Sequence, residues 1–597
     1  MKQFSVSSIA LVVSSTLFLS ACGVSQHEAS TSTLDSTQPV SKEERVAGSI
    51  DSRVEQLADH LAEQEGDVSA DAVLSSPPVM RQLAEKKSMH HSASLVRSKA
   101  KIGMSFLSPQ HVQSQYFPQP TVVDRENYQA IASNPIHVAL NNPVSTFSID
   151  VDTGSYSNVR RFINGGRLPQ HNAVRVEELV NYFNYDYPQP DTSNIPFQIT
   201  TEVAPSPWNA DSHLLHIGIK GYDIDSSALP NANLVFLVDV SGSMNSPQKI
   251  GLLKQSLKLI TQKMRVDDRI SIAVYAGASG VVLEGKSGND KAEIMRAIDQ
   301  FQAGGSTNGA AGINLAYQLA QTHFIKGGIN RVLLATDGDF NVGTVNFEAL
   351  IDMVENRRQS GISLTTLGFG QGNYNDHLME QLADKGNGNY AYIDTLQEAR
   401  KVLVEEMSST LHTIAKDVKI QVEFNPDLVQ EYRLIGYENR ALNREDFNND
   451  KVDAGEVGAG HSVTALYEVT FVGGAGHRVD PLRYGKREQH LEKSDASNEL
   501  AFVKLRYKQP DQNVSKLMTQ PVLKSDRYTE FNNASDRFKF AAAVAGFGQI
   551  LSGGKFTQDF TLKNVEVIGL SAKGSDAWGY RSEFINLVRL AEALNPS

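Results

Sequence analysis

The sequence predicts a multidomain protein of the α/β class, with a doubly wound, mostly parallel sheet flanked by β-sandwich-like and C-terminal helical regions. The chain has 597 residues, enough for several hydrophobic cores rather than one. Between residues 232 and 414, short apolar runs alternate with amphipathic segments, as in repeated βαβ units. On either side of this region, apolar and polar residues alternate one by one, which is typical of antiparallel strands.

The amino terminus predicts export and lipid anchoring. An apolar run that begins at Ile9 is too short to span a bilayer, so residues 1–21 are expected to be a signal peptide. Leu19-Ser-Ala-Cys22 resembles the bacterial lipobox, which implies cleavage before Cys22 and acylation of that cysteine, for example with palmitate. An ordinary signal peptide that contains a cysteine is the alternative. Gly23 resembles an outer-membrane sorting signal, so the folded part is expected to be periplasmic or surface-exposed.

Composition excludes several classes of function. Cys22 is the only cysteine, so disulfides and thiol catalysis are not expected in the mature protein. A formal net charge of −12 argues against non-specific nucleic-acid binding. Residues 22–135 are rich in Ser, Gln, Glu and Ala, which predicts a flexible tether that follows the lipidated cysteine.

Folded structure is expected from residue 136, with an N-terminal region over residues 136–231. Short helices are predicted near 158–165 and 174–183, and two strands joined by a turn within 196–222. A cluster of aromatic residues is expected to pack this region onto the sheet domain rather than to form a ligand platform: Tyr182, Phe183, Tyr185 and Tyr187.

The sheet domain is predicted over residues 232–414. Its buried parallel strands are expected at four apolar runs, 233–239, 269–276, 331–337 and 362–370. Amphipathic helices separate these runs, and a long helix over 396–416 is expected to close the domain.

The last region, residues 415–597, is predicted to be β-rich and then helical. Antiparallel strands are expected at 418–426, 432–438, 461–472 and 500–508, and helices at 536–551 and 579–594. The strands of 196–222 have the same alternating pattern. We therefore expect them to share one β-sandwich with the strands of 418–508, so that the sheet domain is an insertion.

Three polar motifs stand at the carboxyl ends of the predicted parallel strands or before the next helix. They are DVSGS at 239–243, GGSTN at 304–308 and TDGD at 336–339. Loops at this end of a doubly wound sheet meet in one crevice. Each motif alone could be a turn or a helix cap. Together they offer carboxylates and hydroxyls without imidazole or thiolate, a donor set that favours Mg²⁺ or Mn²⁺ over Zn²⁺.

This set resembles the metal-ion-dependent adhesion site of the von Willebrand factor A domain, a Rossmann-like fold. The resemblance implies that Ser241, Ser243 and Thr307 ligate a divalent cation (Mg²⁺, or Mn²⁺ or Ca²⁺) through their hydroxyls. Asp239 and Asp337 would act mostly through bound waters. An Asp or Glu carboxylate from a protein partner would then complete the coordination.

The wider chain resembles a family of bacterial lipoproteins with a von Willebrand factor A domain. STFSIDVDTGSYSNVRRFINGGRLP and VRVEELVNYFNYDYP resemble the associated N-terminal region. FNPDLVQEYRLIGYENRAL and DAGEVGAGHSVTALYEV resemble a C-terminal domain of unassigned function. The family implies no established reaction.

We therefore predict a non-enzymatic envelope lipoprotein that binds a protein partner through the metal. The alternative is a structural envelope scaffold in which the metal only stabilises the fold, and a hydrolase is a third possibility. FSIDVDTGSYS, 147–157, contains Asp-Thr-Gly, but an aspartic protease needs two such loops. A phosphatase motif needs Thr or Val where Gly154 stands. The segment is expected to be a structural turn, so no catalytic residue is predicted.

Two other candidates are weaker. Residues 446–453 resemble the start of a calcium loop, but an EF-hand needs Gly and Glu where Lys451 and Val457 stand, so an Asx-rich turn is favoured over bound Ca²⁺. Four histidines lack metal-ligand spacing and are expected to be solvated or capping residues: His90, His91, His213 and His216.

Overall fold

The computed structural model describes residues 126, 128, 130, 132–149, 151–190, 195–338, 347–372, 374–480, 483 and 495–595. The expected signal peptide, Cys22, His90, His91 and most of the expected tether lie outside the described residues, as does Asp339. Within the described ranges, no helix combines the length and the apolar character needed to cross a membrane.

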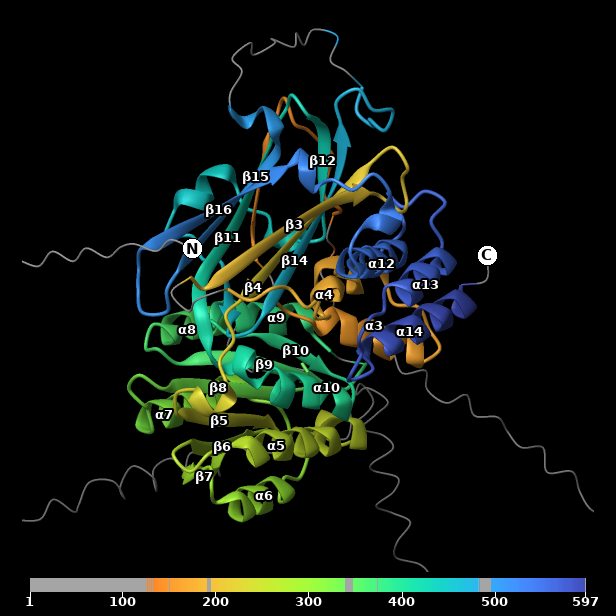
Figure 1. The fold of residues 1–597 in the computed structure, drawn as a ribbon. Coiled ribbons are helices and arrows are strands. Elements are labelled where there is room, and N and C mark those ends of the chain that lie inside the picture. The colour runs from red at the N-terminus through yellow and green to blue at the C-terminus, as the bar shows by residue number, and fades with distance from the viewer. Residues whose placement is uncertain are drawn as a thin grey trace, which may run out of the picture. The chain divides into compact units, whose positions relative to one another are not determined.

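A six-stranded sheet forms the centre of the inserted domain (Figure 1). Its order is β10-β9-β8-β5-β6-β7. The four predicted parallel strands are confirmed as β5 (Ala232–Asp239), β6 (Arg269–Tyr275), β8 (Ile329–Thr336) and β9 (Ser363–Phe369).

Two strands of this sheet were not predicted. β7 (Ser279–Ser287) pairs antiparallel with β6 at one edge; most of its side chains are exposed or half-buried, and its apolar run is only three residues long. β10 (Tyr390–Ile393) pairs parallel with β9 at the other edge and is only four residues long. Both strands are specified by pairing with a neighbour rather than by their own pattern.

Helices cover both faces of this sheet (Figure 1). Along β5, Leu234 and Phe236 pack into one core, whereas Val235 and Leu237 pack into the other. The first core includes residues of α5 (Leu252–Lys263), α6 (Lys291–Asp299) and α10 (Leu396–Arg400). The second includes residues of α7 (Gly309–Thr322), α8 (Phe347–Arg358) and α9 (Asp376–Lys385). Burial on both faces explains the continuous apolar runs.

The prediction of one long helix over residues 396–416 is wrong at its carboxyl end. After α10, a π-helical turn spans Lys401–Glu405, α11 spans Met407–Leu411, and β11 already begins at Thr413. Ile414 and Ala415 are 2% and 0% exposed and belong to the core of the flanking sandwich. Burial in that core overrides the helical pattern.

The flanking strands form two antiparallel sheets that share one core. One sheet has the order β1-β12-β14-β4-β3, and the other has the order β13-β11-β15-β16 with β2 also paired to β11. β4 pairs with β14 from Lys220↔Ser462 to His213↔Val469, so strands before and after the insertion are neighbours. This pairing confirms the expected shared β-sandwich. The bounds are β1 (His137–Val138), β2 (Val144–Ser148), β3 (Phe197–Pro205), β4 (His213–Gly221), β11 (Thr413–Phe424), β12 (Val429–Ile435), β13 (Gly455–Gly458), β14 (Ser462–Phe471), β15 (Glu499–Lys508) and β16 (Ser515–Leu523).

A helical core lies beside one sheet of the sandwich (Figure 1). It is built from α3 (Gly154–Asn164), α4 (Val176–Asn181), α12 (Asp536–Leu551), α13 (Leu562–Ser571) and α14 (Tyr580–Leu594). The aromatic cluster of Tyr182 to Tyr187 packs here, and Phe183 makes edge contacts with Phe540 and Phe584. The expectation of packing is therefore confirmed, but its main partners are the C-terminal helices rather than the inserted sheet.

Candidate metal centre

Asp239 is the last residue of β5, and its side chain is fully buried. Its Oδ1 accepts a hydrogen bond from the backbone NH of Ser241 at 2.8 Å. Its Oδ2 accepts hydrogen bonds from the Thr336 hydroxyl at 2.8 Å and from the Tyr275 hydroxyl at 3.2 Å. Three neighbouring segments therefore fix the orientation of this carboxylate.

The electrostatics of Asp239 favour a nearby cation. Burial raises the pKa of its carboxyl, hydrogen bonds from Ser241 and Thr336 lower it, and the negative charge of Asp337 raises it again. Two carboxylates thus repel one another in a site with little water. A bound cation would relieve that repulsion.

Ser243 lies in a short 3-10 turn that spans Gly242–Met244, and Ser241 directly precedes that turn. Their hydroxyl oxygens lie 3.0 Å apart. Two adjacent ligands of an octahedral Mg²⁺, each at about 2.1 Å, are separated by about 3.0 Å. The spacing of the two hydroxyls therefore fits neighbouring positions on one such ion.

The second motif is held against the first by the backbone. The NH of Gly242 donates to the carbonyl of Gly305 at 3.0 Å, and the NH of Gly304 donates to the carbonyl of Val240 at 2.7 Å. Gly305 has a φ of +86°, which favours glycine at this bend. Thr307, two residues further on, is half-buried and directly precedes the Asn308 cap of α7.

The third motif follows β8. Asp337 is 0% exposed, and its Oδ2 accepts a hydrogen bond from Lys249 Nζ at 2.8 Å. Lys249 lies on a π-helical turn, Pro247–Gly251, that leads into α5. Sequence reasoning missed this lysine. Its closeness to the DVSGS motif along the chain, six residues after Ser243, was the only available signal.

The donor set as a whole suits a hard cation. In the part of the chain that the structure describes, no group of three or more His, Cys, Asp or Glu side chains could hold a metal. Any metal at this centre would thus depend on hydroxyl ligands beside two carboxylates, which is the chemistry of Mg²⁺, Mn²⁺ or Ca²⁺ sites.

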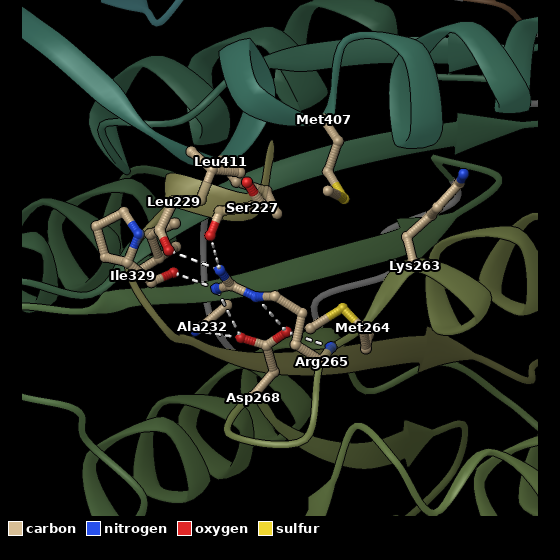
Figure 2. A pocket seen from close by; sticks show the side chains of 11 residues that line it. Ser227, Leu229, Ala232, Lys263, Met264, Arg265, Asp268, Ile329, Met407 and Leu411 are labelled. Atoms are coloured by element: carbon tan, nitrogen blue, oxygen red, sulfur yellow. Dashed lines mark hydrogen bonds and ion pairs between the residues drawn. The ribbon is translucent and has the colours of Figure 1, made fainter. Parts of the chain in front are cut away.

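A small cavity of about 240 Å³ lies at the other end of β5 (Figure 2). Arg265 closes one side, because its guanidinium donates to the carbonyls of Leu229 and Pro230, each at 2.7 Å. Asp268 accepts from the same guanidinium at 3.1 Å and from the NH of Ala232 at 2.8 Å. These contacts fix the segment that leads into the first residue of β5. The cavity therefore lies at the opposite end of this strand from Asp239.

The other sequence candidates have structural roles. Asp152 lies just before Thr153, the N-cap residue of α3. It is 5% exposed and accepts a hydrogen bond from the NH of Tyr390. The expectation of a solvated or capping role is wrong for His216, which is 0% exposed with Nε2 2.8 Å from the Tyr187 hydroxyl, and burial lowers its pKa to about 3. His213 also has a lowered pKa of about 4, because of burial and the charge of Arg527.

The acidic residues of 446–453 are each engaged by protein groups. Asp446 accepts from the NH of Asn443 in a capping box. Asp450 pairs with Arg506, and Asp453 pairs with Arg358 at 2.8 Å. These contacts agree with the Asx-rich turn favoured over a calcium loop.

Three regions of the chain match known protein families. Residues 233–406 match the von Willebrand factor type A domain, residues 122–216 match a region described as von Willebrand factor, and residues 409–594 match the C-terminal region of YfbK. The chain is 49% identical over 473 residues to "Uncharacterized protein YfbK" of Escherichia coli (strain K12), which covers 78% of this chain and 81% of that protein. This protein belongs to the YfbK family. The inserted sheet domain of this YfbK-family protein is therefore a von Willebrand factor A domain.

More distant similarity concerns shorter or more divergent parts. Human inter-alpha-trypsin inhibitor heavy chain H3 is 25% identical over 253 residues, which covers 40% of this chain and 28% of that relative. Among solved structures, a von Willebrand factor type A protein from Catenulispora acidiphila has 14% identity and a TM-score of 0.38, and the match covers 66% of this chain and 89% of that one. Von Willebrand factor A domains generally mediate protein–protein interactions and commonly bind a divalent metal.

Proposed function

We propose that this YfbK-family protein is an envelope-anchored lipoprotein that binds a protein partner through a divalent cation. The ligand set would be Asp239, Ser241, Ser243, Thr307 and Asp337, and the cation Mg²⁺, Mn²⁺ or Ca²⁺. The observation that carries the proposal is the 3.0 Å separation of the Ser241 and Ser243 hydroxyls next to buried carboxylates at the carboxyl end of a doubly wound sheet.

Each residue would have a distinct part in binding. The hydroxyls of Ser241, Ser243 and Thr307 would contact the cation, and Asp239 and Asp337 would hold its waters. Tyr275 and Thr336 orient Asp239 through hydrogen bonds to Oδ2. When bound, the cation supplies a positive centre for an Asp or Glu carboxylate of the partner, and neutral hydroxyl ligands leave much of its charge available to that carboxylate.

We infer binding rather than hydrolysis. Hydrolysis at a metal requires a general base beside the attacking water. Both oxygens of Asp239 already accept hydrogen bonds, and Asp337 is paired with Lys249. These contacts engage both carboxylates in orienting the centre and in pairing with Lys249, a role that differs from that of a general base.

The test is crosslinking in intact cells, with and without EDTA, followed by identification of captured proteins by mass spectrometry. Ser243→Ala and Asp239→Ala are expected to lose the captured partner, as is wild type in EDTA. Asp267→Ala removes an exposed carboxylate of the same domain and is expected to behave as wild type. Ser243 is only half-buried, so its variant separates loss of binding from loss of folding.

Two results would contradict the proposal. If Asp239→Ala captures the same partners with and without EDTA, binding does not depend on the metal. If EDTA lowers the melting temperature but leaves capture unchanged, the protein is the structural scaffold in which the metal only stabilises the fold.

The lipid anchor has its own test. Metabolic labelling with a palmitate analogue is expected to label wild type and not Cys22→Ser. Fractionation is expected to place wild type, but not the variant, with the outer membrane. Equal labelling of both proteins would exclude Cys22 as the acylation site.

A further inference from the structure

A lysine is built into the proposed metal centre. Lys249 Nζ lies 2.8 Å from Asp337 Oδ2, and the two side chains are 12% and 0% exposed. Lysine is rarely buried without a partner, and an unpaired buried carboxylate is costly. The ion pair therefore contributes to the charge balance of the centre in the absence of any metal.

The position of this lysine is set by packing. The π-helical turn Pro247–Gly251 carries it, and its aliphatic stem lies against Gly370, directly after β9. A Cβ on Gly370 would lie 2.3 Å from Cε of Lys249, so the stem occupies the space that a larger residue would take. Gly370 also has a φ of +81°, a conformation that favours glycine. The turn that carries Lys249 and the packing of its stem on Gly370 thus direct the ammonium towards Asp337.

The charge of Lys249 opposes that of an incoming cation. Asp239 and Asp337 together bring two negative charges to the centre, and one ammonium offsets one of them. A divalent cation would therefore meet a weaker negative potential and the repulsion of a nearby positive charge. Both effects lower its affinity.

We propose that Lys249 is a resident counter-ion that competes with the divalent cation for Asp337. This inference rests on the proposed function, because it concerns the same centre. Lys249 satisfies Asp337 in the metal-free protein and keeps the metal affinity of the partner-free protein low. An acidic partner adds negative charge to the centre, so partner and metal bind cooperatively.

The experiment measures Mn²⁺ binding by titration calorimetry and by electron paramagnetic resonance, without any partner. Lys249→Met keeps the length of the side chain and removes the charge. It is expected to bind Mn²⁺ at least about tenfold more tightly than wild type. Lys258→Met is the matched control, because Lys258 of α5 pairs with Asp299 of α6 at 2.5 Å but is 31% exposed and not at the centre. It is expected to keep the wild-type affinity.

Thermal unfolding gives a second readout. In EDTA, Lys249→Met leaves Asp337 without its ammonium partner and is expected to melt below wild type. Saturating Mn²⁺ is expected to remove that difference. The double variant Lys249→Met/Asp337→Asn carries neither charge, so it is expected to stay folded in EDTA even if the single variant does not. In the Asp337→Asn background, removal of the lysine is expected to change Mn²⁺ affinity less than in wild type.

Each outcome decides the matter. Tighter Mn²⁺ binding by Lys249→Met, with a smaller effect of the lysine substitution in the Asp337→Asn background, supports the inference, including the case in which wild type alone shows no binding. Equal or weaker binding by the variant, beside measurable binding by wild type, overturns this inference and leaves the proposed function standing. An equal effect of the lysine substitution in the two Asp337 backgrounds also overturns it. No Mn²⁺ binding by any of the proteins overturns both proposals.

Discussion

The backbone NH of Tyr390 donates a hydrogen bond to Oδ1 of Asp152, at 2.8 Å. Asp152 belongs to the segment that resembles a hydrolase motif, and Tyr390 is the first residue of the edge strand β10 of the von Willebrand factor A domain. Arg440 also approaches the other oxygen of Asp152, at 3.4 Å. Asp152 therefore joins the N-terminal region to the inserted sheet and to the sandwich region.

Substitution of Asp152 tests this structural role. In Asp152→Ala the NH of Tyr390 loses its acceptor in a buried place, so unfolding free energy is expected to fall by about 1–3 kcal/mol. Asp152→Asn keeps an oxygen for that NH and is expected to lose less. Urea unfolding measures both. Mn²⁺ affinity is expected to stay at the wild-type value, and a hydrolytic turnover that disappears in Asp152→Asn would contradict this assignment.

Gly154 is required by the same contact region. A Cβ at Gly154 would lie 2.3 Å from Cε1 of Tyr390, which is closer than any ordinary contact. Gly154→Ala is therefore expected to lower the free energy of unfolding by about 1–3 kcal/mol, because Tyr390 is buried and must shift. Gly280→Ala on β7 is the control, since nothing lies within 4 Å of its added Cβ. Equal unfolding midpoints for the two variants would show that Tyr390 moves freely.

Arg160 is 1% exposed and joins three regions of the chain. Its guanidinium donates to Asp394, directly after β10, to Glu398 of α10 and to Glu583 of α14. Arg160→Met would leave two buried carboxylates without their cation, at a cost of about 3–5 kcal/mol in urea unfolding.

An arginine with an exposed side chain provides the control for this loss of unfolding free energy. Arg589 pairs with Glu566, but its own side chain is 49% exposed. Arg589→Met is expected to cost less than about 1 kcal/mol. Similar losses for the two arginine variants would mean that the Arg160 cluster does not hold the regions together.

His216 predicts a dependence of stability on pH. Burial, with a smaller effect of the charge of Arg537, lowers its pKa from 6.5 to about 3 in the folded protein. Between these values the unfolded chain takes up a proton that the folded protein does not. This contribution to stability is therefore complete above pH 6.5 and is lost as the pH falls towards 3, by up to about 1.4 kcal/mol per pH unit.

His216→Leu is expected to remove that part of the pH dependence. Urea unfolding from neutral pH to about pH 4 should show a shallower loss of stability than in wild type, by about one proton. His171→Leu replaces an exposed histidine in the same way and is the control for the substitution itself. An unchanged slope in His216→Leu would mean that another group takes up the proton.

Prediction from sequence succeeded where one local pattern carried the information. The stretch LVFLV, residues 234–238, is apolar at every position because β5 is buried on both faces, and the pattern alone identified it. The helix expected at 536–551 agrees with α12, which spans Asp536–Leu551. The three polar motifs could be placed at one sheet edge because the carboxyl ends of parallel strands share that edge.

Prediction failed where a neighbour decided the structure. β16 contains Pro521 and has mostly exposed or half-buried side chains, so only its pairing with β15 makes it a strand. Residues 413–416 continue a helical pattern in the sequence. They nevertheless form the start of β11, because Ile414 is buried in the core of the sandwich. Lys249 had no distinguishing pattern, because its significance comes from Asp337, 88 residues away in the chain.

The amino-acid sequence was sufficient to identify the βαβ character of the inserted domain, the candidate hydroxyl and carboxylate ligands, and the regions with alternating and continuous apolar patterns. These features depend on residue type and short-range periodicity, which can be read from the amino-acid sequence without a structure. The folded structure was needed to show that Asp152 connects three regions of the chain, that the aromatic cluster packs on the C-terminal helices, and that Lys249 pairs with Asp337. Those outcomes depend on which distant groups meet in a place from which water is excluded, where a single charge or hydrogen bond has its largest effect.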